Sequence, residues 1–377
     1  MEQIVAWFER IFIGILAWFY ALTGGALLLP VPIRITVPPA VMLVSENEYA
    51  VMWATNKRGS GRLTVTTDSV ERTFHDAASG TIRSDDTLHV VRVPKAVLDG
   101  CDSYRVHSQY VLFHAGYFAF KGCQAASREY GFRGYAGQSE IRALFFTDVH
   151  GQREQALRNA AALTQEAPAD LVIFAGDISN DGLFIKKSFT GGILALAAAM
   201  SGGGIPVLYC RGNHEARGQW ATELRRYFPT GTGEMYYTAG YGPVSFTVLD
   251  TGEDKADDHP EYAGLADFAA YRAREDAWLR ALPMAPGYGY RVCVSHMGGL
   301  NQAGIFDNWF APLRDNLGVT HVFCGHGHDN RTWVSNGLRC YEDGGTDIGS
   351  LLVFRDGEIF AKSVAAPGDI RDFGKLG

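Results

Sequence analysis

Five short polar motifs, each placed directly after an apolar run, constrain the fold of this chain more than any other feature. The runs are IRALFFT, DLVIFA, IPVLYC, RVCVS and THVFC, and the motifs are Asp148-Val149-His150, Gly176-Asp177, Arg211–Glu215, His296 and Gly325–His328. Helical stretches follow the first runs, the first of them over residues 152–165. Strands that alternate with helices are typical of an α/β fold, in which ligands bind beyond the carboxyl ends of the strands. The pattern therefore predicts all five motifs on loops at the same edge of one sheet.

Residues 31–138 show a different pattern of apolar and polar residues. Short runs with alternating apolar residues, such as RLTVTT and TLHVVRV, are separated by turn-like segments that include NKRGSG. Strands at this spacing predict a small all-β sandwich, and Trp53 and Tyr104 are placed to fill its core. The Gly-rich segment 131–139 marks a boundary. The sequence thus predicts a sandwich over 31–138 and an α/β domain over 139–377, in keeping with a chain of 377 residues.

The first 30 residues form a separate hydrophobic segment. Residues 11–30 contain no charged side chain, and about twenty apolar residues are long enough to cross a bilayer. Glu9 and Arg10 precede them in place of the basic start of a signal peptide. Two interpretations stay open: a membrane anchor or uncleaved signal, and an apolar helix that packs on the protein or lies at a membrane surface. An extracytoplasmic or membrane-anchored location is expected, and a cytoplasmic one is the alternative.

Charge and cysteine usage narrow the class of protein. The formal net charge is -7 and no long Lys/Arg run is present, so no nucleic-acid partner is expected. None of the six cysteines forms a C-x-x-C pair, although Cys101 and Cys123 could form a disulfide in an exported protein. The histidines of the predicted sandwich, which nothing connects to a metal, are interpreted as ordinary: His75, His89, His107 and His114.

The five motifs together gather two Asp, one Asn and five His. Carboxylate and imidazole ligands suit Zn, Fe, Mn or Co. One catalytic zinc needs only about three protein ligands, so this set is too large for a single ion. Two ions about 3.5–4 Å apart and bridged by a carboxylate would use all of it. The sequence predicts a dinuclear site for two divalent ions of open identity.

The order of the motifs, D-x-H, G-D, G-N-H-E, H and G-H-x-H, resembles the calcineurin-like metallophosphoesterase superfamily over residues 139–364. The resemblance implies a four-layer α/β/β/α sandwich and a hydrolase of phosphate mono- or diesters. It implies that the first metal is held by Asp148, His150, Asp177 and His328. It implies that the second metal is held by Asp177, Asn213, His296 and His326. A hydroxide shared by both ions would attack the phosphorus, and His214 would stabilise the transition state or protonate the leaving oxygen.

A sandwich ahead of such a module resembles the purple acid phosphatase branch, whose leading domain is fibronectin type III-like. The sequence departs from that branch at two positions. His150 stands where the branch has Gly, and Asn180 stands where it has a Tyr iron ligand. Without a phenolate ligand we expect no purple Fe(III) colour, and two divalent ions are favoured.

Several residues near the motifs are candidates for contact with a small phosphoester substrate. Besides Asn213 and His214, Arg217 lies just past G-N-H-E and is placed to bind a phosphate oxygen. The acidic segment 250–265 follows a strand and could lie over the site, with His259 or Tyr262 touching substrate. Its acids would discourage a highly anionic substrate on that side.

Two other functions stay open. A nuclease of the same superfamily would need a basic track or a DNA-binding extension, and the sequence offers neither. A membrane-anchored scaffold protein would bind partners through the β-sandwich and carry a degenerate catalytic fold. A missing ligand position would favour the scaffold, but every position is filled.

Overall fold

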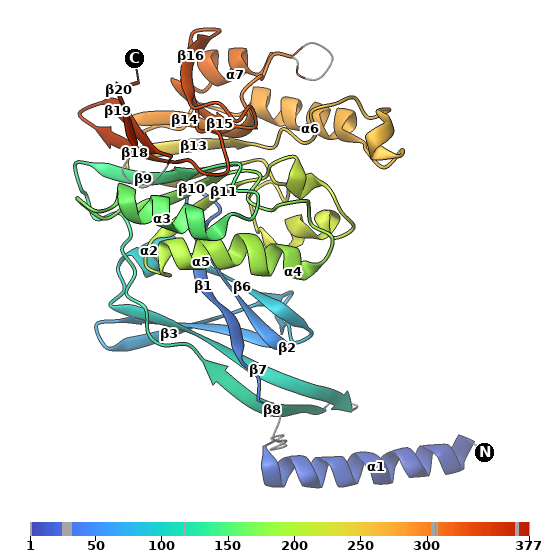
Figure 1. Ribbon diagram of the computed structural model, residues 1–377. Helices are drawn as coiled ribbons and strands as arrows, with labels where there is room; N and C mark the ends of the chain where they lie inside the picture. The colour runs from blue at the N-terminus through green and yellow to red at the C-terminus, as the bar shows by residue number, and fades with distance from the viewer. Residues whose placement is uncertain are drawn as a thin grey trace. The chain divides into compact units, whose positions relative to one another are not determined.

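The computed structural model describes residues 2–24, 32–115, 118–302, 306, 308–365 and 369–376, and Figure 1 shows its elements. The chain divides into two compact units. The smaller comprises Met1–Pro39, Val51–Arg92 and Cys101–Gly131, and the larger comprises Ala40–Ala50, Val93–Gly100 and Phe132–Gly377. The larger unit thus takes two short segments from the range predicted as a sandwich. The predicted domain ranges 1–30, 31–138 and 139–377 stay predictions.

The first sheet of the larger unit is built around three parallel strands, β9 (Ile141–Phe146), β10 (Leu171–Ala175) and β11 (Pro206–Cys210). Three antiparallel strands extend it beyond β9: β18 (Gly349–Arg355), β19 (Glu358–Val364) and β20 (Ile370–Lys375). The end of β1 (Ile35–Leu43) pairs in parallel with β11. Every side chain of β10 and β11 is buried, as expected for central strands covered on both faces.

The second sheet of this unit has six strands. Their order is β12 (Tyr237–Tyr241), β13 (Val244–Leu249), β14 (Tyr290–Met297), β15 (His321–Gly325), β17 (Leu338–Glu342) and β16 (Arg331–Ser335). The strands β13, β14, β15 and β17 are parallel. The two sheets pack face to face, because the ring of Phe145 lies 5.9 Å from that of Phe323 and 6.2 Å from that of Tyr341.

Helices cover the outer faces of both sheets (Figure 1). The first sheet is covered by α3 (Arg153–Leu163), α4 (Lys186–Ser188), the π-helical η1 (Phe189–Leu194) and α5 (Ala195–Ser201). The second sheet is covered by α6 (Phe268–Ala281) and α7 (Phe310–Asp315). The predicted four-layer α/β/β/α architecture is confirmed. Shorter pieces are α2 (Lys95–Asp99) and the 3-10 helices η2 (His214–Ala216), η3 (Ala221–Tyr227) and η4 (Pro260–Tyr262).

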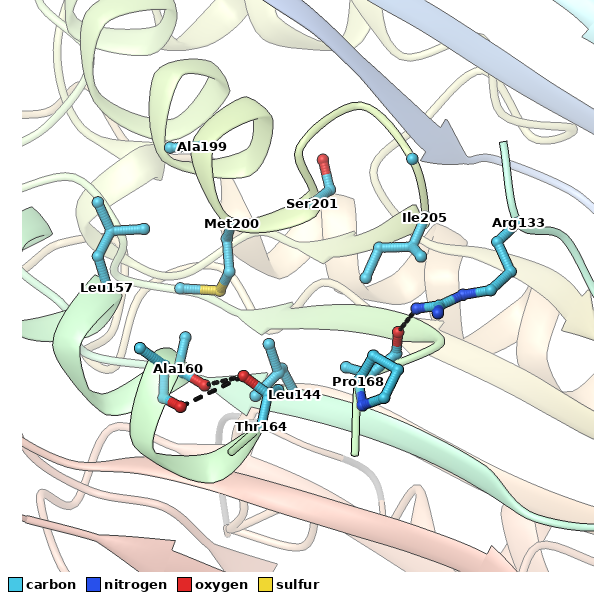
Figure 2. A pocket seen from close by; sticks show the side chains of 13 residues that line it. Arg133, Leu144, Leu157, Ala160, Thr164, Pro168, Ala199, Met200, Ser201 and Ile205 are labelled. Carbon is cyan, nitrogen blue, oxygen red and sulfur yellow. Dashed lines mark hydrogen bonds between the residues drawn. The ribbon is translucent and has the colours of Figure 1, made fainter. Parts of the chain in front are cut away.

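Figure 2 shows a pocket of about 510 Å³ on the helical side of the first sheet. Leu157 and Ala160 of α3 and Met200 of α5 line it, and Arg133 donates a hydrogen bond to the carbonyl of Ala169 at one side. Its lining contains no residue of the five motifs, so the pocket is separate from the candidate site described below.

The smaller unit is mostly β-structure. Its elements are α1 (Glu2–Thr23), most of β2 (Glu48–Thr67), β3 (Val70–His75), β4 (Ala77–Ala78), β5 (Thr81–Ile82), most of β6 (Asp86–Pro94), β7 (Ser103–Ala115) and β8 (Phe118–Ala126). In it β2 pairs with β3 and β7, and β7 pairs with β8. Trp53 and Tyr104 are fully buried, and the Trp53 indole donates to the Ser108 hydroxyl at 2.8 Å. The fibronectin type III resemblance stays a prediction.

The segment NKRGSG was expected to be a turn and is instead part of β2, so two predicted strands form one strand of 20 residues. Gly59 and Gly61 explain the difference. A Cβ atom at Gly59 would collide with the carbonyl of Gln109 on the neighbouring strand β7. These glycines allow two strands to approach closely rather than reversing the chain.

The helix α1 begins before the uncharged segment 11–30 and covers residues 11–23 of that segment. Residues 25–31 lie outside the described residues. Gln3–Thr23 is long and apolar enough to cross a membrane by length and composition, with a mean hydropathy of 1.6. Within the smaller unit, the ring centroid of Phe19 lies 6.4 Å from that of Phe120 on β8. No disulfide joins Cys101 to Cys123 in the described chain.

Candidate metal centre

The five motifs meet in the larger unit, but they come from two sheets. The first three follow β9, β10 and β11 of the first sheet, and the last two lie at the ends of β14 and β15 of the second. The expectation of one sheet was therefore wrong. Each sheet has its own parallel strands, and the two sheets bring the carboxyl ends of those strands together when they pack face to face.

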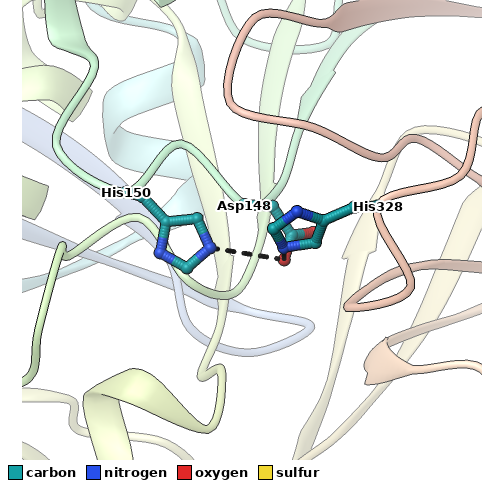
Figure 3. A group of neighbouring side chains, drawn as sticks. All are labelled: Asp148, His150 and His328. Carbon is teal, nitrogen blue, oxygen red and sulfur yellow. Dashed lines mark ion pairs between the residues drawn. The ribbon is translucent and has the colours of Figure 1, made fainter.

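The first group of ligand-type side chains is Asp148, His150 and His328 (Figure 3). Asp148 Oδ2 accepts hydrogen bonds from the Thr147 hydroxyl at 2.8 Å and from the His326 backbone N–H at 2.9 Å. Asp148 Oδ1 is buried and has no hydrogen bond among the described residues. It lies 3.2 Å from His328 Nε2 and 3.8 Å from His150 Nε2. A buried carboxylate oxygen that faces two imidazole nitrogens fits a cation site.

The second group is Asp177, Asn213, His296 and His326. His296 Nδ1 lies 2.9 Å from the Ala175 carbonyl, so this nitrogen donates its proton. Nε2 of the same ring then faces Asp177 Oδ2 at 3.1 Å and Asn213 Oδ1 at 3.0 Å. His326 Nδ1 lies 3.2 Å from that Asn213 oxygen. Buried acceptor atoms that face one another at these distances need a proton or a metal ion among them.

The side-chain amide of Asn213 has two orientations with different consequences. With Oδ1 toward the imidazoles, it offers an oxygen ligand to a cation. With its nitrogen there, it donates to His326 at 3.2 Å and to His296 at 3.0 Å, and its oxygen accepts from Arg217 Nη2 at 3.1 Å. The first orientation suits a metal-loaded site and the second suits a metal-free one, since hydrogen bonding alone assigns the amide.

Asp177 lies where the two groups meet. Its Oδ2 is 3.1 Å from His296 Nε2 in one group and 4.0 Å from His150 Nε2 in the other. Its Oδ1 accepts a hydrogen bond from the His214 backbone N–H at 2.9 Å. The structure therefore brings together all seven side chains that the sequence marked as metal ligands, with Asp177 in the centre.

The titration behaviour of the metal-free site follows from this crowding. Burial would lower the pKa of His296, but the neighbouring Asp177 and Asp148 carboxylates outweigh it and raise the pKa to about 10. Burial would raise the pKa of Asp177, but His296 outweighs it and keeps that pKa well below its usual value. Burial lowers the pKa of His150 and of His326. A metal ion at His296 would therefore displace a proton.

Backbone strain is concentrated at this site. Five of its residues have positive φ angles between 44° and 74°, a region that side chains other than glycine rarely adopt: Asp148, His150, Asp177, His326 and His328. Strain of this kind persists only where the surrounding structure enforces it. Gly212 permits the close packing around Asp177, because a Cβ atom at Gly212 would collide with the backbone nitrogen of Asp177.

Glu215 holds the loops after β10 and β11 together. Its buried carboxylate accepts backbone hydrogen bonds from Asp177 at 2.9 Å, Gly212 at 2.8 Å and Ser179 at 2.7 Å. Burial, together with the negative charge of Asp177, raises the pKa of Glu215 to about 7. Three backbone donors on one buried side chain make it a positioning residue for the centre of the site.

His214 lies at the exposed side of the centre. Its Nδ1 donates to the backbone carbonyl of Asn180 at 2.6 Å, which turns Nε2 toward Asp177 Oδ2 at 3.8 Å. Its ring lies 4.7 Å from that of His150, and its side chain is 26% exposed. Because the acceptor is a backbone carbonyl, the Asn180 side chain is not needed for this contact.

Arg217 lies on the same side of the centre as His214, but its guanidinium is already paired with a carboxylate. Its Nε and Nη2 donate to the two carboxylate oxygens of Glu253 at 2.6 and 2.9 Å. The Tyr262 hydroxyl lies 3.4 Å from the same carboxylate, so the acidic segment 250–265 borders the site. The His259 ring instead accepts from the Glu261 backbone N–H and caps η4.

Three residues of the site were given no role by sequence reasoning: Thr147, Glu215 and Glu253. Glu215 stands inside G-N-H-E, yet nothing in the motif indicates that its side chain turns back under the loop. Thr147 immediately precedes Asp148, and this adjacency was the available signal. Glu253 is separated from its partner Arg217 by 36 residues, so no local pattern could have found it.

Comparison with known proteins identifies the family. The family model described as calcineurin-like phosphoesterase matches residues 141–330, just over half of the chain. A dimetal phosphatase from Danio rerio is similar in structure, with 12% identity, a TM-score of 0.44, and coverage of 62% of this chain and 98% of that one. GAP50 of Plasmodium, described as the anchor in the inner membrane complex, has 10% identity, a TM-score of 0.42, and coverage of 63% and 90%. The phosphopantetheinyl hydrolase of Mycobacterium tuberculosis has 16% identity, a TM-score of 0.34, and coverage of 54% and 89%.

No curated protein matches the sequence significantly. The match of the family model agrees with the five motifs and with the four-layer fold that brings them together. The chain belongs to the calcineurin-like phosphoesterase family.

Proposed function

We propose that this protein hydrolyses phosphoric esters with two divalent metal ions. One ion would be held by Asp148, His150, Asp177 and His328, and the other by Asp177, Asn213, His296 and His326. The observation that carries the proposal is the position of Asp177 Oδ2, 3.1 Å from His296 Nε2 and 4.0 Å from His150 Nε2. A carboxylate placed between two imidazole-containing groups could serve both ions of a dinuclear centre. The mixed Asn, Asp and His set suits Mn, Fe, Zn or Co.

The metal ions, when bound, activate water near neutral pH and neutralise charge on the phosphoryl oxygens. His214 then serves as a proton donor for the leaving oxygen. Its Nδ1 proton is committed to the Asn180 carbonyl, so only Nε2 is available to carry the transferred proton. Partial exposure of the ring gives it access to a bound ester.

We propose further that diesters, which carry one negative charge, are preferred over dianionic monoesters. The support is the charge around the centre. Arg217 is paired with Glu253, Arg331 with Glu342 at 3.0 Å, and Lys255 with Asp254 at 2.9 Å. Each of these cations is already neutralised by a carboxylate, so a second negative charge on the substrate gains little from them.

A pocket of about 420 Å³ beside His326 offers room for the second ester group. Trp333 and Arg331 line it, and the Arg331 guanidinium lies 5.1 Å from the indole ring centroid. A Cβ atom at Gly298 would meet the indole at 3.0 Å, so this glycine makes space for the ring. An aromatic wall next to the centre suits an apolar or aromatic alcohol group.

A membrane-associated location is part of the proposal. Seven large apolar side chains of α1 are between 58% and 66% exposed: Ile4, Trp7, Phe8, Phe12, Ile15, Trp18 and Leu22. A bilayer or its surface would cover them.

The test compares hydrolysis of bis-p-nitrophenyl phosphate and p-nitrophenyl phosphate by the full chain in detergent, with added Mn²⁺ or Zn²⁺ or with EDTA. We expect metal-dependent turnover, with a higher kcat/KM for the diester. Asp177→Asn is the control and should be inactive with either ester. Turnover that survives EDTA or the control would refute the two-metal site, and a higher kcat/KM for the monoester would refute the diester preference alone.

A further inference from the structure

Another cavity, of about 310 Å³, lies within the smaller unit between β2, β3, β7 and β8. Five of its lining residues can carry positive charge, and none is a carboxylate: Arg62, His75, His107, His114 and Lys121. Three of the four histidines interpreted as ordinary from the sequence therefore share one cavity. The fourth, His89, lies apart, with its Nε2 3.0 Å from the Thr55 hydroxyl.

Strand register explains how the cationic groups converge. Arg62 on β2 is directly opposite His75 on β3 and directly opposite His107 on β7. Side chains opposite each other on neighbouring strands share one face of the sheet, with Cβ atoms about 5 Å apart. The three side chains thus form a row across the sheet, and Lys121 on the next strand, β8, completes the lining.

The charge in this cavity is not balanced within the part of the chain that the structure describes. Arg62 and Lys121 have no ion pair there, and His107 Nε2 is buried without a hydrogen-bond partner. Of the acids on β3 and next to it, Asp76 pairs with Arg83 at 3.3 Å and Glu71 pairs with Arg105 at 2.9 Å. Like charges opposite each other destabilise a sheet unless something compensates them.

We propose that this cavity binds a phosphate-class oxyanion, separately from the candidate metal centre. The fork of the Arg62 guanidinium matches two oxygens of such an anion, and Lys121 adds a point charge. The imidazoles of His75, His107 and His114 each contribute an N–H donor. The volume is within the range of small-molecule sites, so the anion is an ester or headgroup as readily as free phosphate.

Two sources of that chemistry fit the smaller unit. One is a soluble phosphate compound. The other is the headgroup of an anionic phospholipid, because β8 carries Lys121 into the cavity and, on its opposite face, carries Phe120, whose ring packs against Phe19 of the apolar helix α1. Both sources place the same oxyanion on Arg62 and Lys121.

The experiment uses the full chain carrying Asp177→Asn, so that phosphate bound at the metal centre does not contribute. Inorganic phosphate is titrated by calorimetry into this protein and into the same protein carrying Arg62→Gln and Lys121→Gln. A parallel arm measures sedimentation with vesicles of phosphatidylcholine, alone or with phosphatidylglycerol. Arg62 and Lys121 are both exposed, so these variants should keep the thermal midpoint of the parent.

The matched control carries Lys57→Gln and Arg72→Gln, which remove two charges outside the cavity. Arg72 is opposite Val65 and so lies on the other face of the sheet, and Lys57 stacks over Tyr110. We expect phosphate affinity, or the gain in vesicle binding from phosphatidylglycerol, to fall at least tenfold in the cavity variant only. Loss of phosphate binding identifies a soluble ligand, and loss of the phosphatidylglycerol gain identifies a headgroup. Equal effects in both variants, or none in either assay, would overturn the proposal.

Discussion

The carboxylate of Glu215 accepts a hydrogen bond from the backbone N–H of Asp177 at 2.9 Å, and this contact links the loop after β11 to the loop after β10. The two further bonds of Glu215, to Gly212 and Ser179, lie in the same two loops. The centre of the metal site therefore depends on a side chain that touches neither substrate nor metal in the proposed mechanism.

Replacing Glu215 by Ala leaves three buried N–H groups without acceptors, and each costs about 1–3 kcal/mol. We expect the free energy of unfolding to fall by about 3 kcal/mol or more in urea titrations, with loss of bound metal. Glu223→Ala in η3, which removes a half-exposed surface carboxylate, should change it by less than about 0.5 kcal/mol. Similar losses in the two variants would contradict the linking role.

His214→Asn tests proton donation separately from metal binding. We expect kcat to fall about 10²- to 10⁴-fold, with metal content unchanged in elemental analysis. The loss should be larger for an alkyl leaving group than for p-nitrophenolate, which leaves without a proton. His150→Asn should instead lose metal. An equal loss for both leaving groups would argue against proton transfer by His214.

Glu253→Gln tests the proposed charge discrimination. Removing this carboxylate frees Arg217 from its two-oxygen contact, so a positive charge becomes available to a dianionic substrate. We expect kcat/KM for the monoester to rise several-fold relative to the diester. Asp258→Asn, which removes an exposed carboxylate of the same segment, should leave the ratio unchanged.

Metal removal should destabilise the folded protein, because the buried Asp148 oxygen and the facing acceptors at His296 then lose their cation. An ion present at 100 times its dissociation constant contributes about 2.7 kcal/mol per site. We expect calorimetry to show a lower thermal midpoint in EDTA than in Mn²⁺ or Zn²⁺. In Asp177→Asn this difference should largely disappear, and its persistence would place the stabilising ions elsewhere.

The metal-free protein should show a pH-dependent stability from His296. Its pKa in the folded state, about 10, is raised above the ordinary value of 6.5, so the folded state binds the proton more tightly. The stabilisation is complete below pH 6.5 and is lost as the pH rises through 10. Urea titrations of the EDTA-treated protein between pH 6.5 and 10 should show this loss. His296→Gln should flatten the curve over that range, and an unchanged slope would exclude His296 as its source.

The sequence was sufficient to predict the α/β fold of the larger unit and the five motifs that meet in it, because each motif stands directly after an apolar strand. Asp148, Asp177 and Asn213 could be assigned to one edge by parallel-strand geometry alone. The sequence could not show that the motifs are distributed over two sheets, because the apolar run before His296 has the same pattern whichever sheet its strand joins.

Long-range contacts account for what the sequence missed. The pairing of Arg217 with Glu253 and the three backbone contacts of Glu215 depend on loops that meet only in the folded chain. Gly59 and Gly61 were misread as turn residues, because glycine serves both turns and close strand contacts. The strand register that places Arg62 beside His75 and His107 likewise could not be predicted from the sequence, because it depends on which strands pair.

The left-handed backbone at Asp148, His150, Asp177, His326 and His328 has a consequence for the life of the protein in a cell. Chains that lack metal would hold this strain without the ions that offset it. Such chains would be expected to open more often, and opened chains are exposed to proteases. Metal supply would then set the amount of folded protein in the cell. A metal shortage would lower that amount before it lowered the turnover of the chains that remain.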